Sequence, residues 1–353
     1  MKIKLDWKAQ MKAAQLYGYK QDYVIEEVPD PIPGPGEVVV KVLGSGVCHS
    51  DLHFWDGSMA ILPLPPFPWI LGHENAGYVH ALGPGASGFE VGEPVAVFGG
   101  WGCGTCKFCL GGEEQLCNVM LWSGLGVPGG YAEYIKVPST RHLVPIGGLD
   151  PVLAAPLTDA CLTPYRAVKK VLPALVPGST ALIFGLGGLG HLGLQLLKKL
   201  TPAKVVVVDP LEQKRELALE LGADLVIDPT SKNVVLETRQ FTNGEGAEGV
   251  LDFVGSDSTM SAAMSSVARR GKVVIVGLAG GSAPVSFYSS SPEAEVTSSY
   301  WGSRTELAEV VALAQSGAIE IRIEKHPLSN INEVFARLQR GEIDGRAVLM
   351  PYE

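Results

Sequence analysis

The hydrophobic residues of this chain follow one pattern before about residue 150 and another after about residue 165. In the first part, short valine-rich runs such as 38–47 and 93–100 are separated by segments rich in glycine and proline. Apolar runs bounded by turn residues are typical of β-strands. We therefore expect residues from Met11 to about Pro145 to form a β-rich domain of the barrel type.

In the second part, continuous apolar runs alternate with segments of helical spacing. The run TALIF at 180–184 precedes a helical pattern at 190–200, and KVVVVDP at 204–210 precedes an amphipathic segment at 212–223. Strands that are buried on both faces of a sheet are apolar throughout, and helices connect parallel strands. This part therefore predicts an α/β domain with a doubly wound parallel sheet.

The composition indicates a folded protein of about two domains, since the chain has 353 residues and a domain has roughly 150. Hydrophobic residues make up 46% and charged residues 18%, which excludes a disordered chain. The net charge of −9 argues against a nucleic-acid partner. The 43 glycines, about 12% of the chain against ~7% in average proteins, indicate many tight turns or close backbone approaches.

Neither a signal peptide nor a membrane-spanning segment is evident in the sequence. The first ten residues have no apolar core, and no stretch approaches the ~18 consecutive apolar residues of a spanning helix. We therefore expect a cytoplasmic protein without a membrane partner. In that compartment, the six cysteines favour metal binding over disulfides.

A glycine-rich string, GLGGLG, lies between a predicted strand and a predicted helix and contains Gly185, Gly187, Gly188 and Gly190. In this context such a string binds a dinucleotide pyrophosphate at the start of the helix. Asp209 ends the next strand, where a carboxylate bonds the ribose hydroxyls of NAD and repels the 2′-phosphate of NADP. The motif predicts an NAD site. The alternative is an ordinary glycine-rich turn followed by an acidic strand end.

Cys103, Cys106, Cys109 and Cys117 have the spacing C-x2-C-x2-C-x7-C. Four thiolates within one loop bind a single tetrahedral zinc ion, and a site filled by four protein ligands is structural. The alternative is an iron–sulfur cluster, whose usual run has three residues before the fourth cysteine and a proline after it. This chain has seven residues there and Asn118 afterwards, so the spacing favours zinc.

Cys48 and His73 suggest a second, open metal site, although neither is decisive alone. Cys48 lies in GVCHSDLH at 46–53, and His73 lies in GHENAGYV at 72–79. A single cysteine is usually a small buried hydrophobic residue. The two residues indicate a metal site more strongly together, because they occur in a chain that also has a nucleotide-binding motif.

Together, these segments resemble the zinc-dependent medium-chain alcohol dehydrogenase family. The resemblance runs from about Met11 to Pro351 and rests on the two strings above, the four-cysteine loop, GLGGLG with Asp209, PLTDACLTPYRAV at 156–168 and GRAVLMP at 345–351. With YWGSR at 300–304, it is closest to bacterial NAD-dependent secondary-alcohol dehydrogenases. It implies a GroES-like β-rich catalytic domain at 1–160, to which 301–353 return, and a Rossmann NAD-binding domain at 161–300.

The resemblance implies two zinc ions per chain, with Cys48 and His73 as the first two ligands of the catalytic ion. The third family ligand is usually cysteine, but the matching position here is Asp159, and Cys161 follows two residues later. Residues two apart on a helix point about 200° apart, so only one of them faces the metal. We expect Asp159 to be the ligand and Cys161 to be a packing residue.

The resemblance also assigns roles around the catalytic zinc. Ser50 matches the residue that hydrogen-bonds the alcohol oxygen, and His53 matches the residue that passes the proton to solvent through the nicotinamide ribose. Asp51 matches the acid that orients His73. The remaining matches are Glu74, an acid behind the zinc that would coordinate it transiently, and His49 and Arg346, which would neutralise the cofactor pyrophosphate.

For the substrate pocket we name Ser50, Trp55, Tyr300 and Trp301, a mostly large and apolar set that suits hydrophobic alcohols. Each aromatic residue has the alternative of an ordinary core position. The expected substrate is a small secondary alcohol or ketone. A primary or aromatic alcohol dehydrogenase is the main alternative, and a polyol dehydrogenase fits an apolar pocket less well.

Two further interpretations remain. A zinc-free quinone reductase of the same fold would lack the set Cys48, His73 and Asp159. A catalytically silent cofactor-binding protein would keep the fold without turnover, which the presence of Ser50 and His53 disfavours. By resemblance alone we expect a homotetramer, with a dimer as the alternative.

Overall fold

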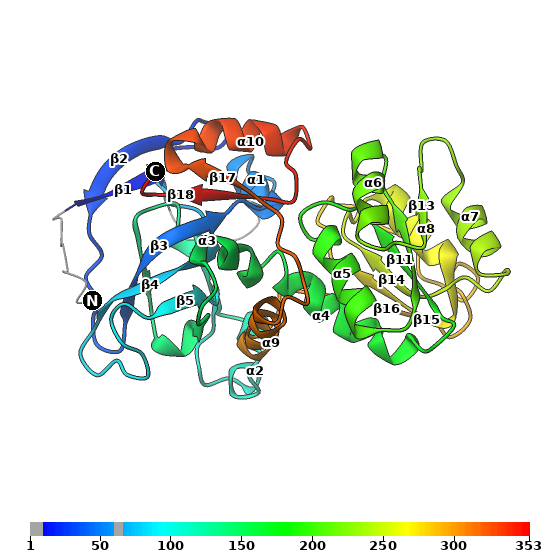
Figure 1. Ribbon diagram of the computed structural model, residues 1–353, viewed down its shortest axis with the longest axis horizontal. Helices are drawn as coiled ribbons and strands as arrows, with labels where there is room; N and C mark the ends of the chain where they lie inside the picture. Colours follow the sequence, from blue (N-terminus) through cyan, green and yellow to red (C-terminus); the bar gives the residue numbers. More distant parts are fainter. Residues whose placement is uncertain (1–9, 60–65) are drawn as a thin grey trace. The chain divides into compact units, whose positions relative to one another are not determined.

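The computed structural model describes residues 10–59 and 66–353. The chain divides into two compact units, each with its own internal contacts. The first consists of Met1–Ala160, Gly302–Gly317 and Ile321–Glu353, and the second of Cys161–Trp301 and Ala318–Glu320. Figure 1 shows the blue, cyan, orange and red segments in the first unit and most of the green and yellow segments in the second.

The first unit is built on a seven-stranded sheet centred on β3 (Val38–Gly46). Antiparallel β4 (Glu74–Leu82) lies on one side of β3, followed by β5 (Pro94–Val97) and β10 (Leu143–Pro145). On the other side lies β18 (Arg346–Met350), followed by β17 (Ile323–Pro327). The last strand of the chain therefore lies beside the strand that leads to Cys48, and both are labelled in Figure 1.

Smaller strands complete this unit. The strand β9 (Tyr134–Val137) also pairs with β3, and β1 (Gln10–Gln15) pairs antiparallel with β2 (Val24–Pro29). A separate three-stranded sheet contains β6 (Gly100–Trp101), β7 (Leu121–Ser123) and β8 (Gly126–Val127).

The helices of the first unit are α1 (His49–Trp55), α2 (Lys107–Leu110), α3 (Pro151–Ala154), α9 (Arg304–Gln315) and α10 (Ile331–Gln339). Its 3-10 turns are η1 (Glu114–Leu116), η2 (Thr140–His142), η3 (Ala155–Thr158) and η5 (Leu328–Asn330).

The valine run that predicts a strand at 38–47 forms β3 and contributes to two cores. Val38, Val40 and Val42 pack with residues of β4, β5 and β9 in one apolar cluster. Val39 belongs to a second cluster with residues of β1. This alternation follows from the two-residue period of a strand, and it explains why the run is apolar throughout. The prediction of a β-rich domain is confirmed.

The second unit contains a six-stranded sheet in which every pairing is parallel. The strand order is β13-β12-β11-β14-β15-β16. The strand bounds are Thr180–Phe184 for β11, Lys204–Val208 for β12, Leu225–Ile227 for β13, Ala247–Asp252 for β14, Val267–Ile275 for β15 and Glu295–Ser298 for β16. This is the order of a Rossmann fold, so the predicted doubly wound sheet is confirmed.

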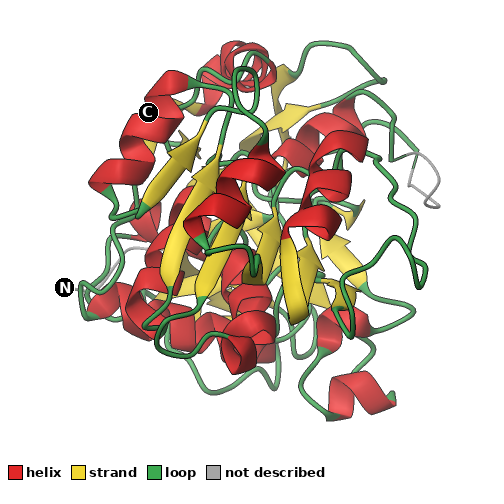
Figure 2. Ribbon diagram, turned by 90° about the vertical axis from the view of Figure 1, so that its right-hand side faces the viewer, coloured by secondary structure: helices red, strands yellow, loops and turns green. Residues whose placement is uncertain are grey.

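Helices cover both faces of this sheet because the direction of the strand order reverses at β11 (Figure 2). Right-handed crossovers place α5 and α6 on one face and α7 and α8 on the other. The bounds are Leu162–Val171 for α4, Gly190–Leu200 for α5, Glu212–Glu220 for α6, Val234–Phe241 for α7 and Asp257–Ser266 for α8, and the turn η4 spans Leu172–Ala174. Across residues 10–59 and 66–353, none of the helices has both the length and the apolar character needed to span a bilayer.

Candidate functional site

The catalytic candidate begins where β3 ends and α1 starts. Gly46 faces Glu74 across the β3–β4 pair, and an ideal Cβ on Gly46 would lie 1.9 Å from Glu74 Oε2. Glycine therefore permits this close approach. Two residues later, Cys48 precedes the first turn of α1, and its backbone N–H donates to Asp51 Oδ2 over 2.9 Å. The turn thus holds the Cys48 side chain at the buried end of β3.

Four possible metal donors meet at this point. One ligand atom from each of Cys48, His73, Glu74 and Asp159 lies within 4.8 Å of all the others, and all four residues are buried. Asp159 Oδ2 is 3.4 Å from Cys48 Sγ and 3.3 Å from His73 Nε2. Thiolate, imidazole and carboxylate are zinc ligands, and three protein ligands leave a position open. The donor set therefore fits a catalytic zinc ion.

The ring of His73 is oriented from behind by a carboxylate. Asp51 Oδ1 lies 3.3 Å from His73 Nδ1, which leaves Nε2 directed at the donor group. Burial by itself lowers the pKa of His73, but the charge of Asp51 and hydrogen bonds with Asp159 and Asp51 raise it well above the usual value. Metal-bound histidines commonly have such a carboxylate partner on the second ring nitrogen.

Glu74 is held by Arg346, a residue of the last strand. The guanidinium of Arg346 donates through Nε to Glu74 Oε2 over 3.0 Å and through a terminal nitrogen to Oε1. The same terminal nitrogen lies 3.7 Å from Asp159 Oδ2. Burial raises the pKa of Glu74 to about 7, although Arg346 opposes this shift. Arg346 therefore compensates two acids of the donor group.

Asp159 and Cys161 differ sharply in their surroundings. Asp159 follows η3 and belongs to the donor group, whereas Cys161 is not part of it. The Cys161 side chain is fully buried, and burial raises the pKa of its thiol. A protonated thiol in an apolar setting acts as a packing residue.

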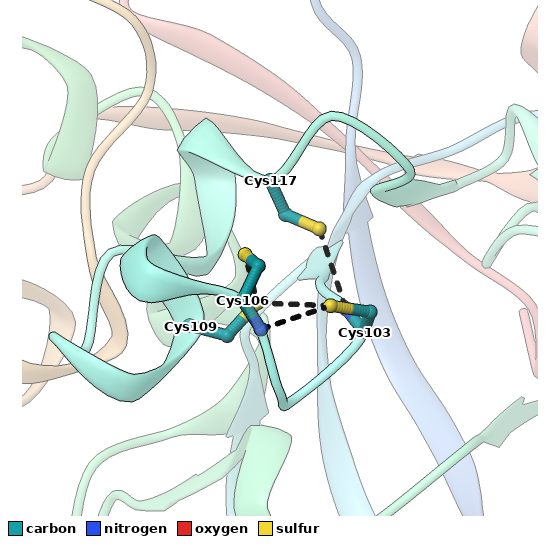
Figure 3. A group of neighbouring side chains, drawn as sticks. All are labelled: Cys103, Cys106, Cys109 and Cys117. Atoms are coloured by element: carbon teal, nitrogen blue, oxygen red, sulfur yellow. Dashed lines mark hydrogen bonds between the residues drawn. The ribbon is translucent and has the colours of Figure 1, made fainter.

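The four-cysteine loop brings its sulfur atoms together in the first unit (Figure 3). Cys106 Sγ is 3.5 Å from Cys109 Sγ, and Cys103 Sγ is 3.9 Å from Cys109 Sγ. Sulfur atoms around a tetrahedral zinc with bonds of about 2.3 Å would be about 3.8 Å apart. All four cysteines are free of disulfides. The loop therefore fits a structural zinc ion.

A charged cluster that the sequence did not reveal supports this loop. Glu114 Oε2 accepts from the backbone N–H of Gly102 over 2.9 Å and from Arg141 over 3.1 Å, and it lies 3.0 Å from His142 Nε2. Arg141 also donates to the carbonyl of Gly102 over 2.8 Å. These contacts hold the peptide immediately before Cys103 in place.

The residues predicted to relay a proton lie on α1. Ser50 Oγ is 3.7 Å from Cys48 Sγ. His53, three residues further, is half-buried, and its Nδ1 lies 3.1 Å from Ser58 Oγ. His49 is exposed at the start of α1, yet desolvation, followed by the charges of Arg346 and His53, lowers its pKa to about 4. His49 is therefore neutral at neutral pH.

The predicted pocket residues are divided between the two units. Trp55 lies at the end of α1 and donates through Nε1 to the Gln21 carbonyl over 2.6 Å. Tyr300 and Trp301 lie in the second unit, where Tyr300 is exposed and Trp301 is buried.

The glycine-rich string joins β11 to α5 as expected. Gly185 has a φ of 83°, which favours glycine, and an ideal Cβ on Gly190 would lie 1.9 Å from the Gly185 carbonyl oxygen. An ideal Cβ on Gly187 would have no atom within 4 Å. The conformation at Gly185 and the close approach at Gly190 therefore explain why glycine is needed at two of the four predicted positions. The other two positions are Gly187 and Gly188.

Asp209 lies directly after β12 and braces this loop. Its Oδ2 accepts from the Leu186 N–H over 2.8 Å, and its Oδ1 accepts from the Leu211 N–H over 2.9 Å. Each oxygen retains a lone pair for a ribose hydroxyl. The loop and this acid fit NAD.

Sequence reasoning missed two aromatic residues, one beside His73 and one beside Asp51. The ring of Trp122 lies edge-on to His73, with ring centroids 5.5 Å apart. Tyr131 donates its hydroxyl proton to Asp51 Oδ2 over 2.8 Å. Tyr131 follows the string GVPGG, which in the sequence is one turn signal among several. The sequence therefore carries no signal that distinguishes Tyr131.

Comparison with known proteins agrees with this geometry. The family model "Alcohol dehydrogenase GroES-like domain" matches residues 34–148, and "Zinc-binding dehydrogenase" matches residues 188–316. An NAD-dependent alcohol dehydrogenase of Sulfurisphaera tokodaii is 35% identical over 351 residues, covering 97% of this chain and all of the relative. A D-arabinose 1-dehydrogenase (NADP(+)) of Saccharolobus solfataricus is also 35% identical, covering 96% of this chain and 97% of the relative.

Solved structures show the same likeness. The alcohol dehydrogenase of Aeropyrum pernix has a TM-score of 0.90 at 39% identity and covers 96% of this chain and 100% of its own. An acetophenone reductase from Geotrichum candidum, solved with NAD, has a TM-score of 0.87 at 33% identity and covers 98% and 99%.

Fold, donor sets and nucleotide loop together define an oxidoreductase of the dehydrogenase class. The chain belongs to the zinc-dependent medium-chain alcohol dehydrogenase family. Its residues fit zinc and NAD as cofactors.

Removal of the Asp159 carboxylate should release one of two zinc ions. We expect Asp159→Ala to bind about one zinc per chain and Cys161→Ala to bind about two, because only Asp159 contacts Cys48 and His73. Metal analysis of the purified variants by mass spectrometry measures this. Loss of zinc in Cys161→Ala with retention in Asp159→Ala would contradict the assignment.

Zinc held by Cys48, His73 and Asp159 should be released by acid. His73 must be neutral to bind metal, and Asp51 raises its pKa in the metal-free chain, so protons compete with the metal already at pH values above the usual histidine pKa, and more strongly as pH falls. We expect the apparent affinity to fall about tenfold per pH unit for each proton taken up as pH falls below that pKa. Chelator competition between pH 8 and pH 5 measures this.

The Asp159→Ala variant serves as the control, because its remaining zinc reports the four-cysteine loop alone. The wild type is expected to bind one zinc ion more than this variant. If the affinity for that ion stayed constant between pH 8 and pH 5, His73 would not be a ligand.

Proposed function

We propose that this protein is a zinc-dependent alcohol dehydrogenase that transfers hydride reversibly between NAD and secondary alcohols or ketones. The observation that carries the proposal is the buried donor set of Cys48, His73 and Asp159, with Ser50 beside it. Two anionic ligands and a neutral imidazole would balance the charge of Zn²⁺. An open fourth position then remains for a substrate oxygen.

The proposed chemistry divides between bound cofactors and side chains. When bound, zinc makes an alcohol oxygen more acidic or polarises a ketone carbonyl, and the nicotinamide exchanges the hydride. Ser50 Oγ hydrogen-bonds the substrate oxygen and takes its proton during oxidation. His53 lies three residues away on the same helical face and carries the proton towards solvent. In ketone reduction the proton moves in the opposite direction.

The other polar residues position these groups. Asp51 orients His73, and Glu74, compensated by Arg346, lies within reach of the metal position. Asp209 binds the ribose hydroxyls, and the glycine string receives the pyrophosphate.

The substrate class is inferred from pocket residues and relatives. Trp55, which is half-buried at the end of α1, offers apolar surface in the first unit, and this favours hydrophobic secondary alcohols. The acetophenone reductase acts on a ketone by name, and this supports the proposal. A primary or aromatic alcohol is the second candidate, since several relatives are named simply as alcohol dehydrogenases. One relative is named as a D-arabinose 1-dehydrogenase, so a sugar is a further substrate to compare with the alcohols.

We also propose that the protein assembles with copies of itself, as a homotetramer or a dimer. Within the described residues, β16 pairs only with β15, so its other edge offers backbone groups to a partner. Phe287 and Tyr288, which precede this strand, are 92% and 94% exposed. An isologous contact would pair this edge with itself and cover these aromatic rings.

Matched alcohols should separate the substrate classes. We expect kcat/KM with NAD to be about tenfold higher for 2-butanol than for 1-butanol, because a site that accommodates the methyl group on the carbinol carbon gains a factor of about ten or more from that contact. Initial rates for the two alcohols and for D-arabinose, each with NAD and with NADP, measure this preference. Higher kcat/KM for 1-butanol would select the primary-alcohol alternative.

The variant Ser50→Ala tests whether turnover uses the proposed site. It should lose most activity while retaining two zinc ions, and Ser87→Ala, which changes an exposed serine of the same unit, should retain activity. Zinc-replete wild-type protein that bound NADH but reduced no ketone in a broad panel would support the silent cofactor-binding alternative.

Polar substitutions at the exposed aromatic pair should weaken assembly. We expect the double variant Phe287→Ser, Tyr288→Ser to have a lower mass in solution than the wild type, because the apolar area available to a partner decreases. Light scattering after gel filtration measures the mass. Leu236→Ser, which changes an exposed apolar residue on α7, is the matched control. A monomeric wild type would refute the assembly.

A further inference from the structure

We propose that Tyr131 is a positioning residue for the catalytic metal, acting through the contact of its hydroxyl with Asp51. The inference rests on the proposed role of His73 as a zinc ligand. It concerns a residue that touches neither a metal donor nor a reacting atom, and it assigns to that residue the orientation of the imidazole.

The geometry around Asp51 defines this role. Its carboxylate is 1% exposed, and two donors converge on one oxygen: the Cys48 N–H at 2.9 Å and the Tyr131 hydroxyl at 2.8 Å, both on Oδ2. The other oxygen, Oδ1, lies 3.3 Å from His73 Nδ1. Two bonds on Oδ2 prevent rotation of the carboxylate, and Oδ1 is therefore directed at His73.

Tyr131 is itself fixed by backbone hydrogen bonds to β1 and to the segment that precedes His73. Its backbone N–H donates to the Leu71 carbonyl over 3.0 Å, and its carbonyl accepts from the Ala14 N–H over 2.8 Å. The side chain is fully buried. A buried side chain anchored on both sides by backbone hydrogen bonds makes a rigid donor.

The ring of Tyr131 also lies against the residue that precedes His73. An ideal Cβ on Gly72 would come within 2.5 Å of Tyr131 Cδ1, and Gly72 has a φ of 99°. The Tyr131 hydroxyl reaches the Gly46 carbonyl at 3.4 Å as well. Tyr131 therefore connects the segment before Cys48, the Asp51 carboxylate and the segment before His73.

The chemistry of the contact favours a strong effect. Burial, followed by the charge of Asp51, raises the pKa of Tyr131, so the hydroxyl stays protonated and donates. A hydrogen bond to a buried carboxylate is charge-assisted and stronger than a neutral one. Loss of a group that supports a metal-bound histidine typically costs about 10- to 100-fold in metal affinity. Because Tyr131 acts through Asp51, we expect the lower end of this range.

Tyr23 provides a matched control in the same cluster. It is also buried, and its ring lies edge-on to Tyr131 with centroids 6.3 Å apart. Its hydroxyl has no hydrogen-bond partner among the described residues. Tyr23→Phe thus removes a buried hydroxyl without removing a bond to Asp51.

The test measures zinc affinity in the full-length protein by chelator competition at constant pH. We expect Tyr131→Phe to weaken one of two zinc ions about tenfold and to leave the other unchanged, whereas Tyr23→Phe should change neither. With Co²⁺ at the weakened site, the visible absorption bands should shift in Tyr131→Phe only. A lower melting temperature with unchanged affinity and unchanged bands would make Tyr131 a packing residue and overturn the proposal.

A double-mutant cycle separates action through Asp51 from direct effects. Tyr131→Phe should have little further effect on zinc affinity in the Asp51→Asn background, because the carboxylate that it positions is absent. Full additivity of the two losses would overturn the proposal.

Failure of the proposed function is distinguishable from failure of this inference. Wild-type protein that bound only the zinc of the four-cysteine loop would overturn both. Wild-type protein with two zinc ions and an unaltered affinity in Tyr131→Phe would overturn the role of Tyr131 alone.

Discussion

The concentration of buried acidic groups is the constraint on which the candidate catalytic site depends. Asp51, Glu74 and Asp159 are all less than 10% exposed; Glu74 and Asp159 lie in the donor group with Cys48 and His73, and Asp51 lies behind the His73 ring. Ionised groups in such surroundings are costly unless they are paired or bind a metal. Each acid accordingly has a defined partner. Asp51 accepts hydrogen bonds from the Cys48 backbone N–H and the Tyr131 hydroxyl. Glu74 and Asp159 share the guanidinium of Arg346. A zinc ion would provide the remaining positive charge.

This arrangement needs three strands that are remote in sequence. The central strand β3 leads to Cys48, β4 begins at Glu74, and β18 begins at Arg346. Both β4 and β18 pair antiparallel with β3, on opposite sides of it. The end of β3 therefore lies beside the beginnings of β4 and β18. The return of the chain end to the first unit is therefore necessary for charge balance as well as for packing.

The nucleotide loop and the four-cysteine loop depend less on long-range packing. In the second unit, β11, the glycine string and α5 are consecutive, and Asp209 is reached within one further strand. Their geometry follows from the tight turn at Gly185 and the close approach at Gly190. In the four-cysteine loop, the ligands lie within fifteen residues, so a short chain segment brings the sulfur atoms together. Glu114 and Arg141 bond to each other and stabilise this short segment further.

Both folds, the glycine string and the four-cysteine loop could be predicted from the sequence, because strand periodicity and motif spacing are local properties. The sequence favours Asp159 over Cys161 by resemblance alone, since the choice depends on how the segment after η3 packs. The contacts of Tyr131 with Asp51, of Cys48 with Asp159 and of Arg346 with Glu74 span 80, 111 and 272 residues. No periodicity or spacing encodes such contacts. They arise when the sheet brings its strand ends together and buried charges must find partners within it.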